Sequence, residues 1–236
     1  YTSDVILVYR IFLSLGIASL VCLIFRRNKI LSEWKWLQTQ SSEKKKKTIR
    51  LIVGSTLLVT TNWFAFIYVI NHVSVQAGAF AYMVCPILTA LCGYFILKEE
   101  VRKEQWIAIV ISVLSISMLA IRFYHDVFFS VSIAILYALY LVLQKQIEGI
   151  NKFHILTLQL FLSSVLILPY YFFLNHSLPM EAHFWSNIAI IAICFTLIPL
   201  FLNLYSLEGL SSGTVGIIIY LNPITAFIVA FCYFGE

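Results

Sequence analysis

The stretch QAGAFAYMVCPILTALCGYFILKE occupies Gln76–Glu99, and GTVGIIIYLNPITAFIVAFCYFGE occupies Gly213–Glu236, in one register without a gap. Each copy is apolar, contains one proline and ends in a glutamate thirteen residues after that proline. The register extends upstream of both copies, where it aligns three further identical pairs: Phe64 with Phe201, Tyr68 with Tyr205 and Ser74 with Ser211. The chain therefore contains an internal repeat with an offset of 137 residues.

The composition is that of a protein embedded in a lipid bilayer. Of the 236 residues, 61% are hydrophobic and 11% are charged, and the mean hydropathy of +0.92 is far from that of soluble domains. Apolar runs of about 18 or more residues predict transmembrane helices. We expect an all-α polytopic membrane protein with eight such helices, at 5–25, 51–71, 77–97, 105–122, 127–145, 154–174, 184–206 and 212–235.

The number of apolar blocks determines how the two copies of the repeat are oriented in the membrane. One repeat period carries five blocks of membrane length, and an odd number of crossings gives the copies opposite orientations. Inverted repeats around a central site are typical of secondary transporters. We divide the chain into a first repeat, 1–123, and a second repeat, 124–236. Five helices in each repeat require one helix before Tyr1 and one after Glu236, so we interpret the chain as helices 2–5 and 6–9 of ten.

Basic residues are concentrated in alternate loops. Nine of the sixteen lysines and arginines lie in 26–50, and five more lie in 98–104 and 144–153. Because basic loops stay on the cytoplasmic side, these three loops are predicted to lie inside. The run Lys44–Lys47 either holds its loop inside or binds anionic lipid headgroups, and the first is the simpler interpretation. No basic patch combines with exposed aromatic residues, so we expect no nucleic-acid partner.

The sequence shows no pattern typical of a metal site or a catalytic centre. The five cysteines fall inside predicted spans without CxxC spacing or neighbouring histidines. No HExxH, GxSxG or Walker A sequence occurs, and no carboxylate falls at mid-membrane. We expect no enzymatic activity, no metal and no cofactor. Arg10 is the one charged residue that lies inside a predicted span away from its ends, so the coupling ion stays open.

Polar and aromatic side chains inside the spans are the candidates for a solute site, because every polar group in hydrocarbon needs a partner or a water-filled cavity. Pro86 and Pro223 are expected to interrupt their helices, either exposing carbonyls at 82 and 219 to a solute or only kinking the chain. Arg10 either pairs with other protein groups or attracts an anionic solute. The candidate substrate-binding residues are Arg10, Asn62, Trp63, Tyr82, Pro86, Tyr137, Tyr140, Thr196, Pro199, Asn203, Tyr220, Asn222 and Pro223.

These motifs resemble the drug/metabolite transporter superfamily with EamA repeats, and within it the RarD branch. The resemblance covers essentially the whole chain, and its most specific part runs from Thr196-Leu-Ile-Pro199 through Gly216 and Tyr220-Leu-Asn-Pro223 to Gly235-Glu236. The other matching stretches are Tyr9-Arg10-Ile11, Thr61-Asn62-Trp63 with Tyr68 and Asn71, Ala81-Tyr82 through Pro86 to Lys98-Glu99, and Tyr140 to Lys145. The chain departs from the branch at Leu141, where glycine is expected, at Gln144, where arginine is expected, and at Tyr205-Ser206, which replaces two alanines.

The resemblance implies a ten-helix carrier of the bacterial inner membrane that exports small metabolites through a central cavity shared by both repeats. Aromatic, amide and hydroxyl groups in that cavity suit a small amphipathic solute such as an amino acid. Alternating access then requires one repeat to rock against the other. A passive channel, a membrane scaffold without transport activity and a nucleotide-sugar-type carrier are the alternatives. The partners we expect are the solute and the lipid bilayer, and the oligomeric state is open.

Overall fold

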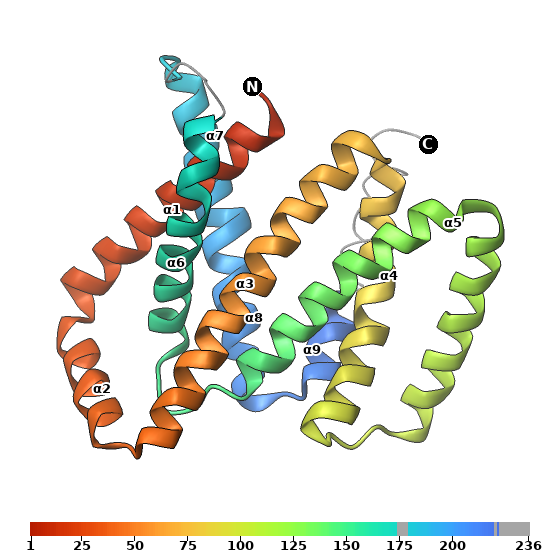
Figure 1. Ribbon diagram of the computed structural model, residues 1–236, viewed down its shortest axis with the longest axis horizontal. Helices are drawn as coiled ribbons and strands as arrows, with labels where there is room; N and C mark the ends of the chain where they lie inside the picture. Colours follow the sequence, from red (N-terminus) through yellow and green to blue (C-terminus); the bar gives the residue numbers. More distant parts are fainter. Residues whose placement is uncertain (174–178, 220, 222–236) are drawn as a thin grey trace. The chain divides into compact units, whose positions relative to one another are not determined.

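The computed structural model describes residues 1–173, 179–219 and 221, most of which are helical and none of which is in a strand (Figure 1). The all-α prediction is confirmed for this part of the chain. The helices are α1 (Ser3–Phe25), α2 (Arg27–Thr39), α3 (Ser42–His72), α4 (Val75–Cys92), α5 (Lys103–Lys145), α6 (Lys152–Phe173), α7 (Ala182–Ala192), α8 (Ile198–Gly209) and α9 (Ser212–Ile218). Two short π-helical segments, η1 (Gly93–Leu97) and η2 (Ile193–Leu197), follow α4 and α7.

Six of the described helical segments are long and apolar enough to cross a membrane, judged by length and composition. They are Ser3–Phe25, Ser42–His72, Ala77–Leu97, Ala120–Lys145, Lys152–Phe173 and Ala182–Gly209. These six coincide with six of the eight predicted spans. The predicted span 105–122 forms the first arm of α5 and is not among the six, and most of the predicted span 212–235 lies outside the described residues.

The loop predicted near 122–126 is replaced by a bend within α5. Helical geometry continues on both sides of Phe123, whose backbone angles (φ −128°, ψ 45°) are not helical. Figure 1 shows the two arms of α5 meeting at this bend. A loop was predicted because the apolar runs 105–122 and 127–145 were assigned to separate spans, but a single non-helical residue is enough to redirect the chain.

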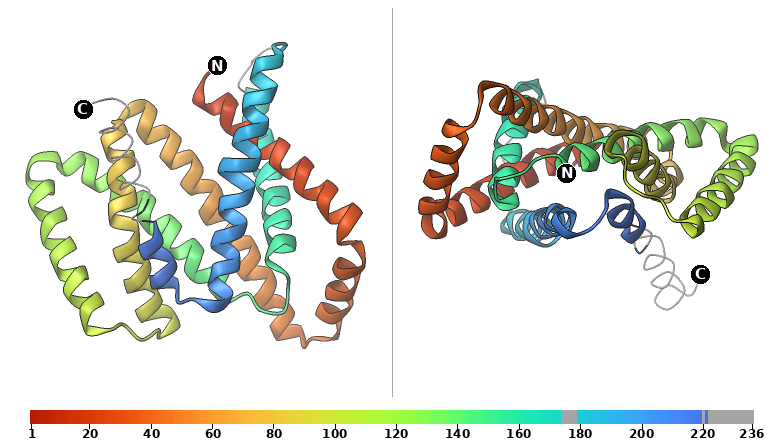
Figure 2. Two further views of the ribbon diagram at one scale, coloured as in Figure 1. Left: turned by 180° about the vertical axis from the view of Figure 1, so that it is seen from behind. Right: turned by 90° about the horizontal axis from the view of Figure 1, so that it is seen from below.

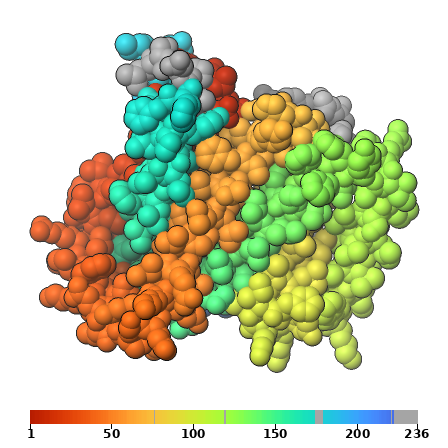
Figure 3. Space-filling model, viewed as in Figure 1, coloured from red at the N-terminus to blue at the C-terminus, as the bar shows by residue number. Residues whose placement is uncertain are grey.

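The first arm of α5 exposes an apolar stripe. Ile107, Ile111, Leu114, Met118 and Ile121 are exposed and recur every three or four residues, which is the spacing of one helix face, and Val110 and Val113 beside them are exposed as well. Figure 3 shows this arm in yellow-green, on the face of the molecule drawn there. An exposed apolar helix face of this length is suited to contact with lipid tails.

The segment 26–50, predicted as a basic loop, is mostly helical. α2 occupies Arg27–Thr39, and α3 begins at Ser42 instead of at 51. In α2 and the residues directly before and after it, the half-buried positions are spaced by three or four, so one face of α2 lies against the protein; they are Arg26, Ile30, Glu33, Leu37 and Gln40. Hydropathy alone does not reveal α2, because its outward face is polar and basic.

The chain forms two compact units, each built from segments that are distant in sequence. Unit 1 comprises 1–60 and 143–208, and unit 2 comprises 61–142 and the described residues from 209 onward. α3 and α5 each contribute one part to each unit. In unit 1, α1 packs against α6 and α7, and in unit 2, α4 packs against α9 (Figure 2).

Aromatic residues hold the helices of unit 1 together, and small residues do so in unit 2. The ring of Tyr9 in α1 lies edge-on to Phe184 of α7 at 5.5 Å, and its hydroxyl is 3.3 Å from that of Tyr171 in α6. In α9, an added Cβ at Gly216 would lie 2.8 Å from Cβ of Thr89 in α4. Glycine therefore permits the close approach of α9 to α4, as is common between transmembrane helices.

α4 continues through Pro86, so the interruption predicted at this proline is wrong. The proline ring removes the backbone hydrogen bond to the carbonyl of residue 82, but the helix continues on both sides of Pro86. The irregular part of this element is η1, which starts seven residues later at Gly93. The corresponding Pro223 lies outside the described residues.

Candidate functional site

Unit 1 contains four of the predicted site residues, on three neighbouring elements. Arg10 is half-buried in α1, and Thr196 is buried in η2, where its hydroxyl donates to the Ile191 carbonyl at 3.1 Å. α1 packs against η2 and α7, and Ser14 donates to the Ala192 carbonyl at 3.4 Å. α8 carries the other two residues, the exposed Pro199 and the half-buried Asn203.

Unit 2 contains six predicted site residues. Asn62 of α3 is buried and donates through Nδ2 to the Ile133 carbonyl of α5 at 2.9 Å, so this amide joins two helices. Tyr137 lies one turn after Ile133 in α5, and the fully buried Tyr140 lies two turns after it. The ring centroids of these two tyrosines are 5.6 Å apart. Tyr82 of α4 is exposed and edge-on to Phe66.

The remaining predicted residues complete this comparison. Trp63 is half-buried in α3, and Pro86 is buried in α4. Tyr220, Asn222 and Pro223 lie outside the described residues. The thirteen candidates are thus divided between unit 1, unit 2 and the part that the structure does not describe, and their roles stay predictions.

Sequence reasoning missed a row of polar side chains along α3 and α6 in unit 1. The Gln159 side chain donates through Nε2 to the Ser55 hydroxyl at 2.8 Å, and the Thr60 and Ser163 hydroxyls are 2.7 Å apart. All four residues are buried. Gln159 and Ser163 are four residues apart in α6 and share one face, whereas Ser55 and Thr60 are five apart in α3; the available signal was the presence of polar residues within two apolar runs.

A buried lysine lies at the start of α6, next to the end of α5. The Lys152 ammonium donates to the Ile147 carbonyl at 2.8 Å and lies 3.5 Å from the Gln144 carbonyl. These carbonyls belong to the last turn of α5 and the residues after it, where helical carbonyls lack intrahelical partners and attract cations. Lys152 was predicted as part of a loop, and its burial makes it a connector of α5 and α6.

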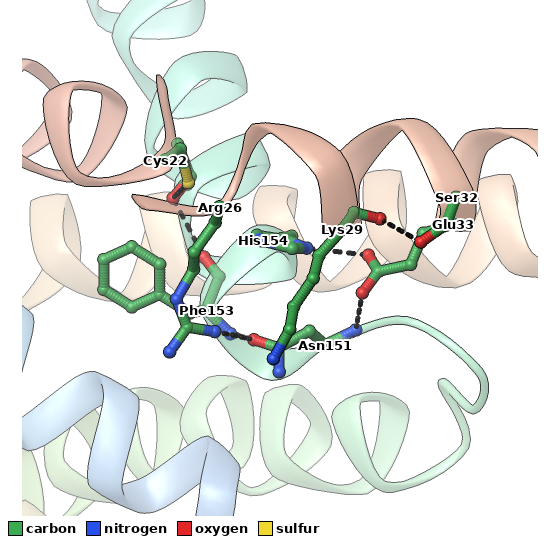
Figure 4. A network of polar contacts seen from close by, with 9 residues as sticks. Cys22, Arg26, Lys29, Ser32, Glu33, Asn151, Phe153 and His154 are labelled. Atoms are coloured by element: carbon green, nitrogen blue, oxygen red, sulfur yellow. Dashed lines mark hydrogen bonds and ion pairs between the residues drawn. The ribbon is translucent and has the colours of Figure 1, made fainter. Parts of the chain in front are cut away.

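A polar network connects α2 with the start of α6 (Figure 4). Glu33 accepts from Nδ1 of His154 at 2.7 Å and from the Asn151 backbone N–H at 3.3 Å. Since a carboxylate only accepts, Nδ1 carries the proton. The Arg26 guanidinium donates to Oδ1 of Asn151 at 3.0 Å and lies 5.2 Å from the Phe153 ring centroid. The network holds α2 against the connection between α5 and α6.

Glu99, the residue that closes the first copy of the repeat, contacts the beginning of the second copy. Its carboxylate accepts from the Ser212 backbone N–H at 2.9 Å and from the Ser212 hydroxyl at 2.7 Å. Ser212 begins α9, so the negative charge lies at the end of a helix where backbone N–H groups are available. Glu99 therefore has a structural contact within unit 2, which the repeat pattern alone did not reveal.

The sequence profile of the EamA-like transporter family matches this chain twice, over residues 2–121 and 126–236. The chain belongs to the EamA-like transporter family. It is accordingly a multi-pass membrane protein of a transporter family, in agreement with its apolar helices. The two matches also agree with the repeat seen in the sequence.

Individual relatives support the assignment. An uncharacterised transporter of Bacillus subtilis, YojE, is 28% identical over 208 residues, which are 86% of this chain and 69% of the relative. Protein RarD of Streptomyces exfoliatus is 25% identical over 237 residues, which cover 98% of this chain and 72% of that protein. Protein RarD of Salmonella typhi is 26% identical over 86% of this chain and 70% of its own length. The resemblance to RarD-like drug/metabolite transporters is confirmed.

Proposed function

We propose that this EamA-family protein is a secondary carrier that exports small metabolites, such as amino acids or amphipathic compounds, by alternating access. The observation that supports it most is the double EamA match over a chain with an internal repeat. Buried amides and hydroxyls inside the apolar helices of both units provide groups that can bind a solute. The carrier uses no cofactor and catalyses no covalent reaction in this proposal.

The proposed location is the bacterial inner membrane, with the basic segments in the cytoplasm. The segment 26–50 carries nine basic residues, whereas the described residues 179–181 between α6 and α7 carry none. Since lysine and arginine are retained on the cytoplasmic side, α2 would lie at the inner surface. The proposed partners are the transported solute and the bilayer, without nucleic acid.

Counterflow into liposomes tests the proposed function. Proteoliposomes are preloaded with an unlabelled candidate, and accumulation of the same labelled solute is followed for a panel of amino acids and amphipathic compounds. A carrier shows saturable, transient accumulation that depends on the preloaded solute. Flux without saturation or trans-stimulation would indicate a passive channel. Absence of flux for the whole panel, from inserted and folded protein, would contradict the proposal and favour a scaffold or a carrier of nucleotide sugars.

A further inference from the structure

Three buried polar side chains of unit 1 have no role yet in the proposed transport mechanism. Ser55 belongs to α3, Gln159 to α6 and Gln144 to the last turn of α5. We call these three residues the glutamine cluster. Their exposed fractions are 0% for Ser55, 2% for Gln159 and 0% for Gln144, so each is more than nine-tenths buried.

The hydrogen bonds of the glutamine cluster are incomplete. Nε2 of Gln159 donates to Ser55, and the Ser55 hydroxyl donates to the Ile52 carbonyl at 3.0 Å. Oε1 of Gln159 and both amide atoms of Gln144 have no hydrogen-bond partner within the described part of the chain. A primary amide has two donor hydrogens and an acceptor oxygen, so most of the capacity of these two side chains is unused.

The backbone segments that carry the two glutamines both approach one turn of α3. An added Cβ at Gly54 would lie 3.4 Å from Cδ1 of Leu143, the residue before Gln144. Ser55, the residue after Gly54, accepts from Gln159. The amides of Gln144 and Gln159 are therefore attached to backbone segments that meet at one place on α3, although they come from different helices.

The cluster is uncharged. Two lysines lie near it along the chain, and both ammonium groups donate to backbone carbonyls: Lys145, the residue after Gln144, to Leu207 at 2.9 Å, and Lys152 to Ile147 at 2.8 Å. Gln159 lies two helical turns beyond Lys152 on the same face of α6, because seven residues correspond to about two turns. Two amides and a hydroxyl together offer both donors and acceptors, which suits a neutral group with both functions better than an anion or a cation.

Buried amides without hydrogen-bond partners destabilise a folded membrane protein unless another molecule supplies the missing donors and acceptors. Burial removes their hydrogen bonds to water, and the surrounding helices are apolar. Ser55 and Gln159 lie within predicted spans and Gln144 lies at the end of one, and polar groups buried between such helices often line a solute pathway. We propose that the glutamine cluster binds a neutral hydrogen-bonding group of the transported solute, a carboxamide or a hydroxyl; this inference rests on the proposed carrier function.

The test uses Gln144→Leu and Gln159→Leu, with Gln38→Leu as a matched control at an exposed position of α2. The probes are labelled L-glutamine, which carries a carboxamide, and labelled L-leucine, which does not. In counterflow, we expect the wild-type protein to favour glutamine. Each cluster variant should raise the KM for glutamine at least tenfold and leave that for leucine within twofold, and Gln38→Leu should change neither.

Thermal stability separates binding from a structural role. Leucine removes an unsatisfied amide, so the midpoint of thermal unfolding of Gln144→Leu should equal or exceed that of the wild type if the amide serves the solute. A lower midpoint with an unchanged KM would overturn the proposal. Gln144→Asn keeps the amide but withdraws it by one methylene; it provides a second variant if leucine prevents folding, and it should also raise the KM for glutamine.

The two proposals fail in different ways. In one case the wild-type protein transports leucine or another panel solute, but the cluster variants have unchanged KM values for every solute. This result overturns the proposed role of the glutamine cluster and leaves the proposed carrier function intact. A folded wild-type protein without counterflow of any panel solute overturns the carrier function. Equilibrium dialysis of labelled glutamine against the purified protein then decides the cluster separately: binding that Gln144→Leu abolishes supports it, and absence of binding overturns it.

Discussion

Single charged residues in this protein connect elements that are far apart in sequence. Glu99 accepts hydrogen bonds at the start of α9, and Glu33 accepts them from the start of α6. Both contacts are charge-assisted and partly buried, so they are stronger than bonds between neutral groups. Substitutions of these two glutamates can be compared with matched controls. Another glutamate, exposed in the structure, serves as the control for each: Glu100 for Glu99 and Glu43 for Glu33.

Replacing Glu99 with alanine should destabilise unit 2. The substitution leaves the Ser212 backbone N–H and hydroxyl without their acceptor, which costs about 1–3 kcal/mol. Glu100→Ala is the matched control, since Glu100 is exposed and no described contact depends on it. The midpoint of thermal unfolding in detergent is the measurement. Equal midpoints for the two variants would show that the contact with Ser212 contributes nothing to stability.

Glu33→Ala should loosen α2 without unfolding the remaining helices. His154 and Asn151 lose their acceptor, and the network is the main polar connection of α2 to α6 among the described residues. Hydrogen exchange of the amides of 27–39 should increase by at least tenfold, while the exchange of α6 beyond its first turn stays unchanged. Glu43→Ala, at an exposed position of α3, should leave the exchange of α2 as in the wild type. Unchanged protection of α2 in Glu33→Ala would contradict this role.

At the scale of elements, most helices could be predicted because hydropathy is a local property. Each apolar run must form its own backbone hydrogen bonds in lipid, so six predicted spans coincide with helices. α2 was not predicted, because only the docking of Glu33 and Trp36 on the connection before α6 distinguishes it from a polar loop. The bend at Phe123 was predicted as a loop for a similar reason, since the continuation of a helix depends on what packs against it.

The candidate site was harder to predict than the helices. Asn62 was selected as a solute ligand from its depth, but its amide bonds the Ile133 carbonyl, and this partner is 71 residues away in sequence. Gln144 and Gln159 were not selected, because their incomplete hydrogen bonding appears only when α3, α5 and α6 are placed together. A sequence pattern identifies polar residues in a membrane, but the satisfaction of their hydrogen bonds is a property of the packed structure.

The packing of α4 against α9 gives a prediction about small residues. Gly216→Ala places a methyl group 2.8 Å from Cβ of Thr89, so the helices must separate, and overpacking of this kind costs about 1–3 kcal/mol. Gly209→Ala is the control, because an added Cβ there meets nothing within 4 Å. The unfolding midpoint should fall for Gly216→Ala and stay at or slightly above the wild-type value for Gly209→Ala. A Gly216 variant as stable as wild type would show that α9 can move away from α4 at little cost.

At the scale of the whole molecule, transport requires that the chain crosses the bilayer in a fixed direction. The repeat, the EamA matches and the apolar helices make this a multi-pass protein, and the distribution of lysine and arginine is what predicts its direction. The concentration of nine basic residues in 26–50 is the strongest part of that signal. It also predicts that α2, with the exposed Trp34, lies at the membrane surface, where tryptophan is enriched.

Cysteine labelling in intact cells tests this direction. Ser42→Cys lies at the exposed start of α3, beside the four lysines, and Met180→Cys lies in the connection between α6 and α7, where the methionine is 91% exposed. A membrane-impermeant maleimide should label Met180→Cys in intact cells and Ser42→Cys only after permeabilisation, because translocating the basic segment is unfavourable. The wild-type protein gives the background, since its cysteines lie within predicted spans. Labelling of Ser42→Cys in intact cells, with Met180→Cys protected, would reverse the proposed orientation and place α2 and its basic residues outside the cell.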